Sequence, residues 1–169
     1  NSTLLEKYNL KNIESFEGFL FPDTYYFTPS MDADDVVSIM VENFFDKIST
    51  VKEFELLSTE KLYYVLRLAS IVEREYRVKE EAPLIASVFS NRLRRTIGLY
   101  SCATVEYIIT EIEGRPHPEV ITYKDLKIES PYNTYIHAGL PPTPISNPGM
   151  VALSAAVNPP KTSYYFFRL

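Results

Sequence analysis

Several residue types that define common protein classes are scarce in this chain of 169 residues. The single cysteine, Cys102, excludes an internal disulfide framework and a cysteine-rich zinc site, and two histidines leave little for a histidine-based metal centre. The formal net charge is -5 and the basic residues do not cluster, which argues against a protein that tracks nucleic-acid phosphates. We therefore expect no metal site, no bound cofactor and no nucleic-acid partner.

Long apolar runs are also missing from the sequence. No stretch reaches the roughly 20 consecutive apolar residues that a membrane-spanning helix needs, and no signal peptide opens the chain. The sequence starts abruptly at Asn1 and stops within the aromatic run 164–167, so both ends look cut from a longer protein. We expect residues outside this chain to decide its topology and compartment.

Apolar and aromatic residues are plentiful. Hydrophobic residues make up 46% of the chain and charged residues 23%, which excludes a disordered protein. The chain also has 13 Tyr, 10 Phe and 12 Pro. A chain of this length buries about 70% of its unfolded surface, so it can form one domain with a real core. The many tyrosines suit polar ring-shaped ligands such as sugars, and they equally suit an aromatic core.

Hydrophobic periodicity predicts an α+β fold with a helical, bundle-like core. Apolar residues at helical spacing, with suitable residues at the starts, predict helices over 33–49, 58–77, 81–96, 103–112 and 148–157. The aromatic, β-prone segments 13–29 and 163–167 predict short strands. Seven of the 12 prolines fall between Pro116 and Pro148, which predicts a long ordered loop.

Glu73 is the most informative residue. On a helical wheel it lies within the apolar stripe of helix 58–77, whereas Glu75 points the opposite way and is expected to be solvated. Burial disfavours a charged carboxylate and favours the protonated form, which is the state that a general acid needs. A structural alternative is that an arginine neutralises Glu73, the candidates being Arg77, Arg92, Arg94 and Arg95.

A second candidate region is the stretch Ser130-Pro131-Tyr132-Asn133-Thr134-Tyr135, followed by Gly139-Leu140-Pro141-Pro142. Prolines restrict the backbone, and tyrosine and asparagine side chains offer stacking faces and hydrogen-bonding groups. This combination is typical of a rigid platform for a sugar or a peptide. The structural alternative is a proline-stiffened connector whose tyrosines cover the core.

Ordered motifs along the chain carry a resemblance to a known family, the endolytic murein transglycosylases (the MltG or YceG-like family). The resemblance covers roughly residues 14–168. The stretches that carry it are Glu17-Gly18 with Phe21-Pro22-Asp23-Thr24-Tyr25, then Leu68-Ala69-Ser70-Ile71-Val72-Glu73-Arg74-Glu75, Ala86-Ser87-Val88-Phe89-Ser90-Asn91-Arg92-Leu93, Ser130 to Tyr135, Gly139 to Pro142, Pro144-Ile145-Ser146-Asn147-Pro148-Gly149 and Asn158-Pro159.

The resemblance implies a role for each matching position. Glu73 matches the family's catalytic glutamate, and the proline-rich loop is expected to line a glycan cleft. One departure is Cys102, which stands where many members have aspartate, so an acidic role at that position is in doubt. The expected substrate-binding residues are Ser101, Tyr132, Asn133, Thr134, Tyr135, Leu140 and Pro141.

The implied reaction is the non-hydrolytic cleavage of the MurNAc-β-1,4-GlcNAc bond of nascent peptidoglycan, which leaves 1,6-anhydroMurNAc ends. Residues 1–169 look like one excised catalytic domain, with 1–13 as a linker remnant from a missing LysM-like module. The implied location is the outer face of the cytoplasmic membrane, beside the peptidoglycan synthases. A hydrolytic muramidase, a non-catalytic peptidoglycan-binding module and a scaffold of the elongation machinery are the alternatives.

Overall fold

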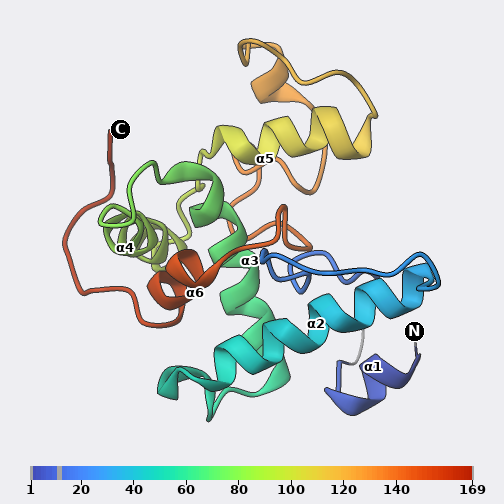
Figure 1. The fold of residues 1–169 in the computed structure, drawn as a ribbon. Helices are drawn as coiled ribbons and strands as arrows, with labels where there is room; N and C mark the ends of the chain where they lie inside the picture. The colour runs from blue at the N-terminus through green and yellow to red at the C-terminus, as the bar shows by residue number, and fades with distance from the viewer. Residues whose placement is uncertain (1, 11–12, 169) are drawn as a thin grey trace.

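The computed structural model describes residues 2–10 and 13–168, and the regular elements in these ranges are all helical. Figure 1 shows α3 running through the centre of the molecule, with α4 and α6 on one side and α2 crossing below it. The α-helices are α1 (Ser2–Lys7), α2 (Ala33–Ser49), α3 (Thr59–Glu75), α4 (Ala82–Arg94), α5 (Cys102–Tyr107) and α6 (Met150–Val157). Short 3-10 helices η1 (Lys52–Phe54) and η3 (Asp125–Lys127) and the π-helical turn η2 (Ile108–Ile112) complete the set.

The predicted helices are confirmed, with ends that shift by a few residues. A capping box opens α2, because the Asp32 side chain accepts from the Asp35 N–H and the Asp35 carboxylate accepts from the Asp32 N–H. Ser58 caps α3 as its sequence position indicates. The last helix begins two residues later than expected, with Gly149 at its N-cap.

The predicted α+β class is wrong, because the described residues contain no strand. In the segment 13–29, the N–H groups of Gly18 and Leu20 both bond to the side-chain Oδ1 of Asn147, at 2.7 and 3.2 Å, where a strand would pair with another backbone. Phe19 is fully buried and packs edge-on against Phe44 at 5.2 Å between ring centroids. The aromatic residues of this segment therefore fill the core beside α2.

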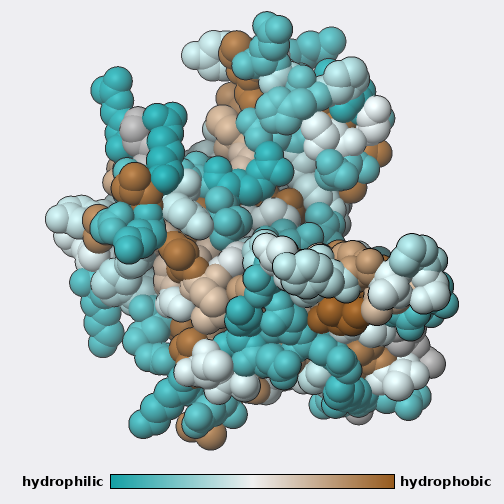
Figure 2. All heavy atoms as spheres, in the orientation of Figure 1, coloured by the Kyte–Doolittle hydropathy of each residue, from teal (hydrophilic) through white to brown (hydrophobic). Residues whose placement is uncertain are grey.

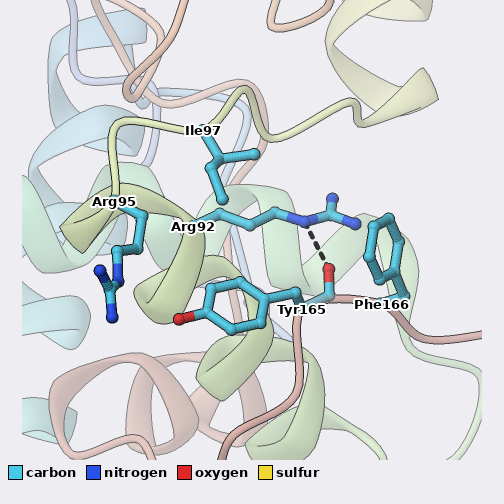
Figure 3. A pocket seen from close by; sticks show the side chains of 5 residues that line it. All are labelled: Arg92, Arg95, Ile97, Tyr165 and Phe166. Atoms are coloured by element: carbon cyan, nitrogen blue, oxygen red, sulfur yellow. Dashed lines mark hydrogen bonds between the residues drawn. The ribbon is translucent and has the colours of Figure 1, made fainter.

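The predicted C-terminal strand 163–167 is also absent, for a related reason. Its carbonyl groups accept hydrogen bonds from side chains of α4, with Asn91 Nδ2 bonding to Tyr164 at 2.7 Å and Arg92 Nε bonding to Tyr165 at 2.7 Å. Figure 3 shows the Arg92 bond, with the Phe166 ring on one side of the guanidinium and Arg95 pointing away from it. An extended segment that α4 side chains hold in this way needs no neighbouring strand.

The hydrophobic core lies where α3 packs against α4, α5 and α6. The α3 residues Leu66, Ala69, Ile71 and Val72 are fully buried. On α6 the buried face is made largely of alanine, so this short helix can approach α3 and α4 closely. The central position of α3 means that its last turn, which carries Glu73, is held from several sides.

The long proline-rich segment is a loop, as predicted, interrupted by η3. The predicted linker segment 1–13 contains α1, whose Leu4 is buried in the core, together with Leu10 just after it. Its assignment to a linker stays a prediction. Within the described ranges, no helix is both long and apolar enough to cross a membrane. Figure 2 shows a largely hydrophilic face with a notch between the lobe that carries α5 and the lobe that carries α2.

Candidate active site

Glu73 lies in the last turn of α3, and its carboxylate faces the start of α6. Its Oε2 atom accepts a hydrogen bond from the backbone N–H of Gly149 at 3.0 Å, and its Oε1 atom accepts one from the Tyr76 hydroxyl at 3.3 Å. The side chain is partly buried, so the enclosed apolar setting expected from the helical wheel is only half realised. The carboxylate is thus oriented by two donors and still reachable from solvent.

The residues before α6 are fastened to α3 one turn ahead of Glu73. The Ser70 hydroxyl accepts from the Ile145 N–H at 3.0 Å, and the Ser70 carbonyl accepts from the Ser146 hydroxyl at 2.8 Å. Ser70 itself is fully buried. These bonds fix the loop against the helix and so place the Gly149 N–H opposite the carboxylate.

Gly149 lies beside both Pro22 and Glu73, and an added Cβ atom would make only ordinary contacts with them. A Cβ atom there would lie 3.6 Å from Pro22 Cγ and 3.9 Å from Glu73 Oε2. Gly149 is also the N-cap of α6, where helix N–H groups favour a negative charge. The carboxylate of Glu73 therefore lies at the positive end of α6, and no described lysine or arginine pairs with it.

The arginine alternative for Glu73 is not what the structure shows. Among the residues that the structure describes, no lysine or arginine forms an ion pair with Glu73. Arg74 pairs with Glu106 at 2.8 Å, and Arg92 donates to the carbonyl groups of Leu99 and Tyr165. Within the described part of the chain, Glu73 is thus left without a neutralising cation.

Glu75 was expected to be solvated, and this expectation is wrong. Its carboxylate lies between α3 and α5, where it accepts a hydrogen bond from the buried Ser101 hydroxyl. Burial raises the pKa of Glu75, the Ser101 bond lowers it, and the nearby charge of Glu106 raises it, with a net increase. The sequence did not show this partner because Ser101 lies 26 residues further along the chain.

The loop 130–135 is attached to the start of α5 through hydroxyl groups. Thr134 Oγ1 accepts from the Ser101 N–H at 3.2 Å and lies 2.9 Å from Thr104 Oγ1. All three residues are buried. Ser101 and Thr134, both predicted to bind substrate, therefore use their polar groups inside the protein and support the loop from behind.

Asn133 is completely buried and bonds within its own loop. Its Nδ2 donates to the carbonyl groups of Leu126 and Ile128 at 3.1 and 2.9 Å, and its Oδ1 accepts from the Tyr135 N–H at 2.9 Å. With these bonds the amide has no group aimed outward. An influence of Asn133 on a substrate would have to act through the shape of the loop.

The two tyrosines of the same loop are partly exposed and lie in different surroundings. Tyr132 stacks at a tilt on Tyr107, with 5.1 Å between ring centroids, and its hydroxyl lies 2.9 Å from Thr143 Oγ1. Tyr135 has its hydroxyl 3.1 Å from the sulfur of the exposed Cys102. Both rings offer faces and hydroxyl groups at the surface, so their predicted role in binding stays a prediction.

Leu140 and Pro141, the remaining predicted contacts, lie beside the middle of α3. Leu140 is partly buried, and the buried Pro141 accepts a hydrogen bond through its carbonyl from Arg67 Nη1 at 3.2 Å. Arg67 is not among the residues predicted from the sequence, although an arginine on a largely buried helix is itself a signal. The loop 139–142 is thus tied to α3 two turns before Glu73.

Glu17, a carboxylate in the first of the sequence motifs, lies beside Tyr107. Glu17 Oε2 accepts from the Tyr107 hydroxyl at 2.6 Å. Burial raises the pKa of Glu17, the Tyr107 bond lowers it, and Glu111 raises it, with a net increase. Burial and the same bond raise the pKa of Tyr107. In the part of the chain that the structure describes, no group of His, Cys, Asp and Glu side chains could hold a metal ion.

The fold and the site together define a helical domain whose central helix carries Glu73 in its last turn, oriented by two donors and, within the described ranges, without a cationic partner. The chain belongs to the YceG-like family, whose pattern it matches over residues 2–169. The endolytic murein transglycosylase of Bacillus subtilis (strain 168) is 38% identical over 159 residues, which cover 93% of this chain and 43% of that protein. That of Streptococcus pneumoniae serotype 2 is 33% identical over 172 residues, covering 98% of this chain and 30% of that protein.

A solved structure shows the same fold. The 2.6 Å crystal structure of a yceG-like protein from Listeria monocytogenes superposes with a TM-score of 0.82 at 34% sequence identity. The match covers 99% of this chain and 56% of that one. The chain therefore spans about a third to just over half of the length of these relatives.

Proposed function

We propose that this domain is an endolytic lytic transglycosylase that cleaves the MurNAc-β-1,4-GlcNAc bond of peptidoglycan and leaves 1,6-anhydroMurNAc ends. The observation that carries the proposal is the surroundings of Glu73, which has two hydrogen-bond donors and, among the described residues, no cationic partner. Membership of the YceG-like family, and relatives that are endolytic murein transglycosylases, support the substrate class.

One carboxyl group serves both halves of the proposed reaction. Glu73 first gives its proton to the glycosidic oxygen, and the bond from that oxygen to C1 of MurNAc breaks. The resulting carboxylate then takes the proton of the C6 hydroxyl of the same MurNAc, while the C6 oxygen forms a bond to C1. Glu73 ends protonated, as it began, and no water is consumed.

The two hydrogen-bond donors to Glu73 suit the stage between the two proton transfers, when the side chain is a carboxylate. Once the proton has left, the carboxylate is stabilised by the Gly149 N–H and by the start of α6. The Tyr76 hydroxyl holds the other oxygen, so the carboxylate keeps its orientation between the two proton transfers. Fixed dipoles of this kind need no rearrangement during the reaction.

The position of Glu75 favours the one-carboxylate scheme over hydrolysis. Most glycoside hydrolases need two carboxyl groups on opposite sides of the scissile bond. Glu75 lies two residues after Glu73, about 200° around the helix, and is held by Ser101. Facing away from Glu73, it is badly placed to act on the same sugar ring.

Location and partners are part of the same proposal. The chain covers only part of its relatives, and a domain acting on nascent strands would work at the outer face of the cytoplasmic membrane. The peptidoglycan synthases are the proposed neighbours, since they make the strands that would be cut. Measuring enrichment of the full-length protein with membranes and with synthases tests this part separately.

The replacement Glu73→Gln tests the assignment directly. It keeps the size of the side chain but removes the proton that the reaction transfers, so release of anhydro-ended fragments should fall by at least about a hundredfold. Chromatography with mass spectrometry on digested murein measures this release. Glu60→Gln, at an exposed position in the first turn of the same helix, is the matched control and should keep normal activity. Wild-type turnover of Glu73→Gln would eliminate the proposal.

A further inference from the structure

A pocket of about 300 Å³ lies between α3, α4 and the loop 139–142, away from the bonds that hold Glu73. None of its lining residues bonds to Glu73, although the loop that forms one wall also leads to Gly149. The lining residues are Tyr64 and Arg67 from α3, Leu93 and Arg94 from α4, and Gly139 and Leu140 from the loop.

Two guanidinium groups face this pocket without an acidic partner. Across residues 2–10 and 13–168, no carboxylate lies within ion-pair distance of Arg67 or Arg94. Arg67 donates to the Pro141 carbonyl at 3.2 Å, and its Nε atom is buried without a hydrogen-bond partner among the described groups. Two unpaired cations at one pocket are notable in a chain with a net charge of -5.

The positions of both arginines are fixed by their own neighbours. The Arg67 guanidinium lies over the Tyr63 ring at 5.4 Å from its centroid, and Arg94 donates to the side-chain oxygen of Asn91. The Tyr64 hydroxyl adds a third donor and feels the charge of both arginines, which oppose the rise in its pKa caused by burial. Arg67 is therefore held in place before any ligand arrives, while the exposed Arg94 and Tyr64 stand at the rim of the pocket.

This donor set suits an oxyanion, either a carboxylate or a phosphate, and the peptide stem of the proposed substrate carries carboxylates. Guanidinium groups bind planar carboxylates through paired hydrogen bonds, and a neutral phenol can add one more. Leu93 and Leu140 supply an apolar wall on which the carbon atoms of the same ligand can rest. The volume is at the lower end of that found for small-molecule sites, so it fits a few residues of peptide.

We propose that this pocket binds the carboxylate-bearing peptide stem of the substrate, an inference that rests on the function proposed above. Arg67 lies six residues before Glu73, which corresponds to about 9 Å along α3 and about 120° around it. A stem of three extended residues spans about 10 Å, so a peptide on the sugar next to Glu73 covers the axial distance and must also pass around the helix to meet the arginines. The loop links the two places, with the Pro141 carbonyl bonded to Arg67 and the Gly149 N–H bonded to Glu73.

Binding can be tested without catalysis by using a muramyl tripeptide, which has one sugar and no glycosidic bond to cut. Calorimetric titration should show that Arg94→Ala weakens binding about tenfold or more, because a charged hydrogen bond is lost. Amidation of the peptide carboxylates should weaken binding to the wild-type protein to a similar extent. Arg95→Ala is the matched control, since Arg95 is exposed and lines a different pocket, and it should bind normally.

The kinetic arm compares peptide-bearing glycan strands with the same strands after an amidase has removed their stems. Arg94→Ala should lower kcat/KM about tenfold on the peptide-bearing strands, mainly through KM, and should leave cleavage of the stripped strands unchanged. Equal losses of kcat/KM on both substrates would overturn the inference. So would an affinity for the tripeptide that neither Arg94→Ala nor amidation changes. If the wild-type protein binds the tripeptide as expected but releases no anhydro product, the proposed function fails and the binding site stands.

Discussion

Glu73 and Glu75 are separated by one residue on α3, yet their surroundings have little in common. Helix geometry turns them about 200° apart, so one faces the start of α6 and the other faces α5. The helical wheel placed Glu73 on the packed side of α3, where it is only partly buried, and placed Glu75 in solvent, because periodicity describes one helix and not what packs against its far side. Long-range partners such as Ser101 and Gly149 are visible only in the fold.

Gly18 is a position where the need for glycine can be measured. Its φ angle is +91°, and a Cβ atom there would lie 2.6 Å from Pro144 Cγ and 2.7 Å from Pro144 Cβ. Gly18→Ala should therefore lower the free energy of unfolding by about 1–3 kcal/mol or more, because a strained backbone is combined with a clash. Urea denaturation measures the loss.

Gly114→Ala separates the two causes. Gly114 also has a positive φ, of +64°, but an added Cβ atom would meet nothing within 4 Å. This variant should lose only the backbone contribution, about 1 kcal/mol. Equal losses for Gly18→Ala and Gly114→Ala would show that contact with Pro144 contributes nothing.

Helices were predictable and strands were not, and the difference has a physical cause. A helix satisfies its backbone groups internally, so caps such as Asp32 and Ser58 and a 3.6-residue period are enough to locate it. A strand needs a partner that the local sequence does not reveal. Here side chains of Asn147, Asn91 and Arg92 bond to the extended segments, and aromatic β-prone residues pack on helices instead.

Within the loop 130–135, replacement of Asn133 should reduce both the stability of the protein and its turnover. Asn133→Ala leaves the partly buried carbonyl groups of Leu126 and Ile128 without their donor, so the free energy of unfolding should fall by about 1–3 kcal/mol. Turnover should fall as well, through disorder of the loop. Hydrogen exchange should show faster exchange at the Tyr135 amide, which loses its acceptor.

Asn43→Ala provides the comparison for this loop. Asn43 is partly exposed and bonds to side chains of Asp23 and Tyr25, so water can replace its contacts. Its replacement should cost less than 1 kcal/mol. An Asn133→Ala protein with normal stability and weaker substrate binding would instead favour a direct contact between the amide and the sugar.

Across the whole molecule, the site gathers short segments that are distant in sequence around one end of α3. The sequence located the glutamate, the motifs and the loop, and the family resemblance joined them. It could not show that Ser101, Asn133 and Thr134 direct their polar groups inward, because burial depends on how the loop folds back on α5. It also missed the pairing of Arg67 with the loop, which is a contact across 74 residues.

The pH dependence of stability should reflect Glu17 and Glu75, whose pKa values are raised in the folded protein. The folded state holds these protons more tightly than the unfolded state, so this contribution to stability is complete below the ordinary value of 4.5 and is lost as the pH rises through the folded pKa. Glu75→Gln keeps an acceptor for Ser101 but cannot ionise. Its stability relative to wild type should therefore increase with pH above about 4.5.

Urea denaturation at a series of pH values checks this sign. Glu119→Gln, which removes an exposed carboxylate, is the control and should follow the wild-type pH profile. A stability difference between Glu75→Gln and wild type that stays constant with pH, or falls as the pH rises, would show that the environment of Glu75 does not disfavour its charge.

The most direct measurement of the central claim is a digestion of murein in water enriched in the heavy oxygen isotope, followed by mass spectrometry of the newly formed MurNAc ends. If Glu73 accepts the proton of the C6 hydroxyl and no water reacts, the new ends will have the anhydro mass and will not contain the isotope. The Glu73→Gln protein will release almost none of these ends. Reducing ends that are one water heavier and labelled would contradict the account, because they would show hydrolysis.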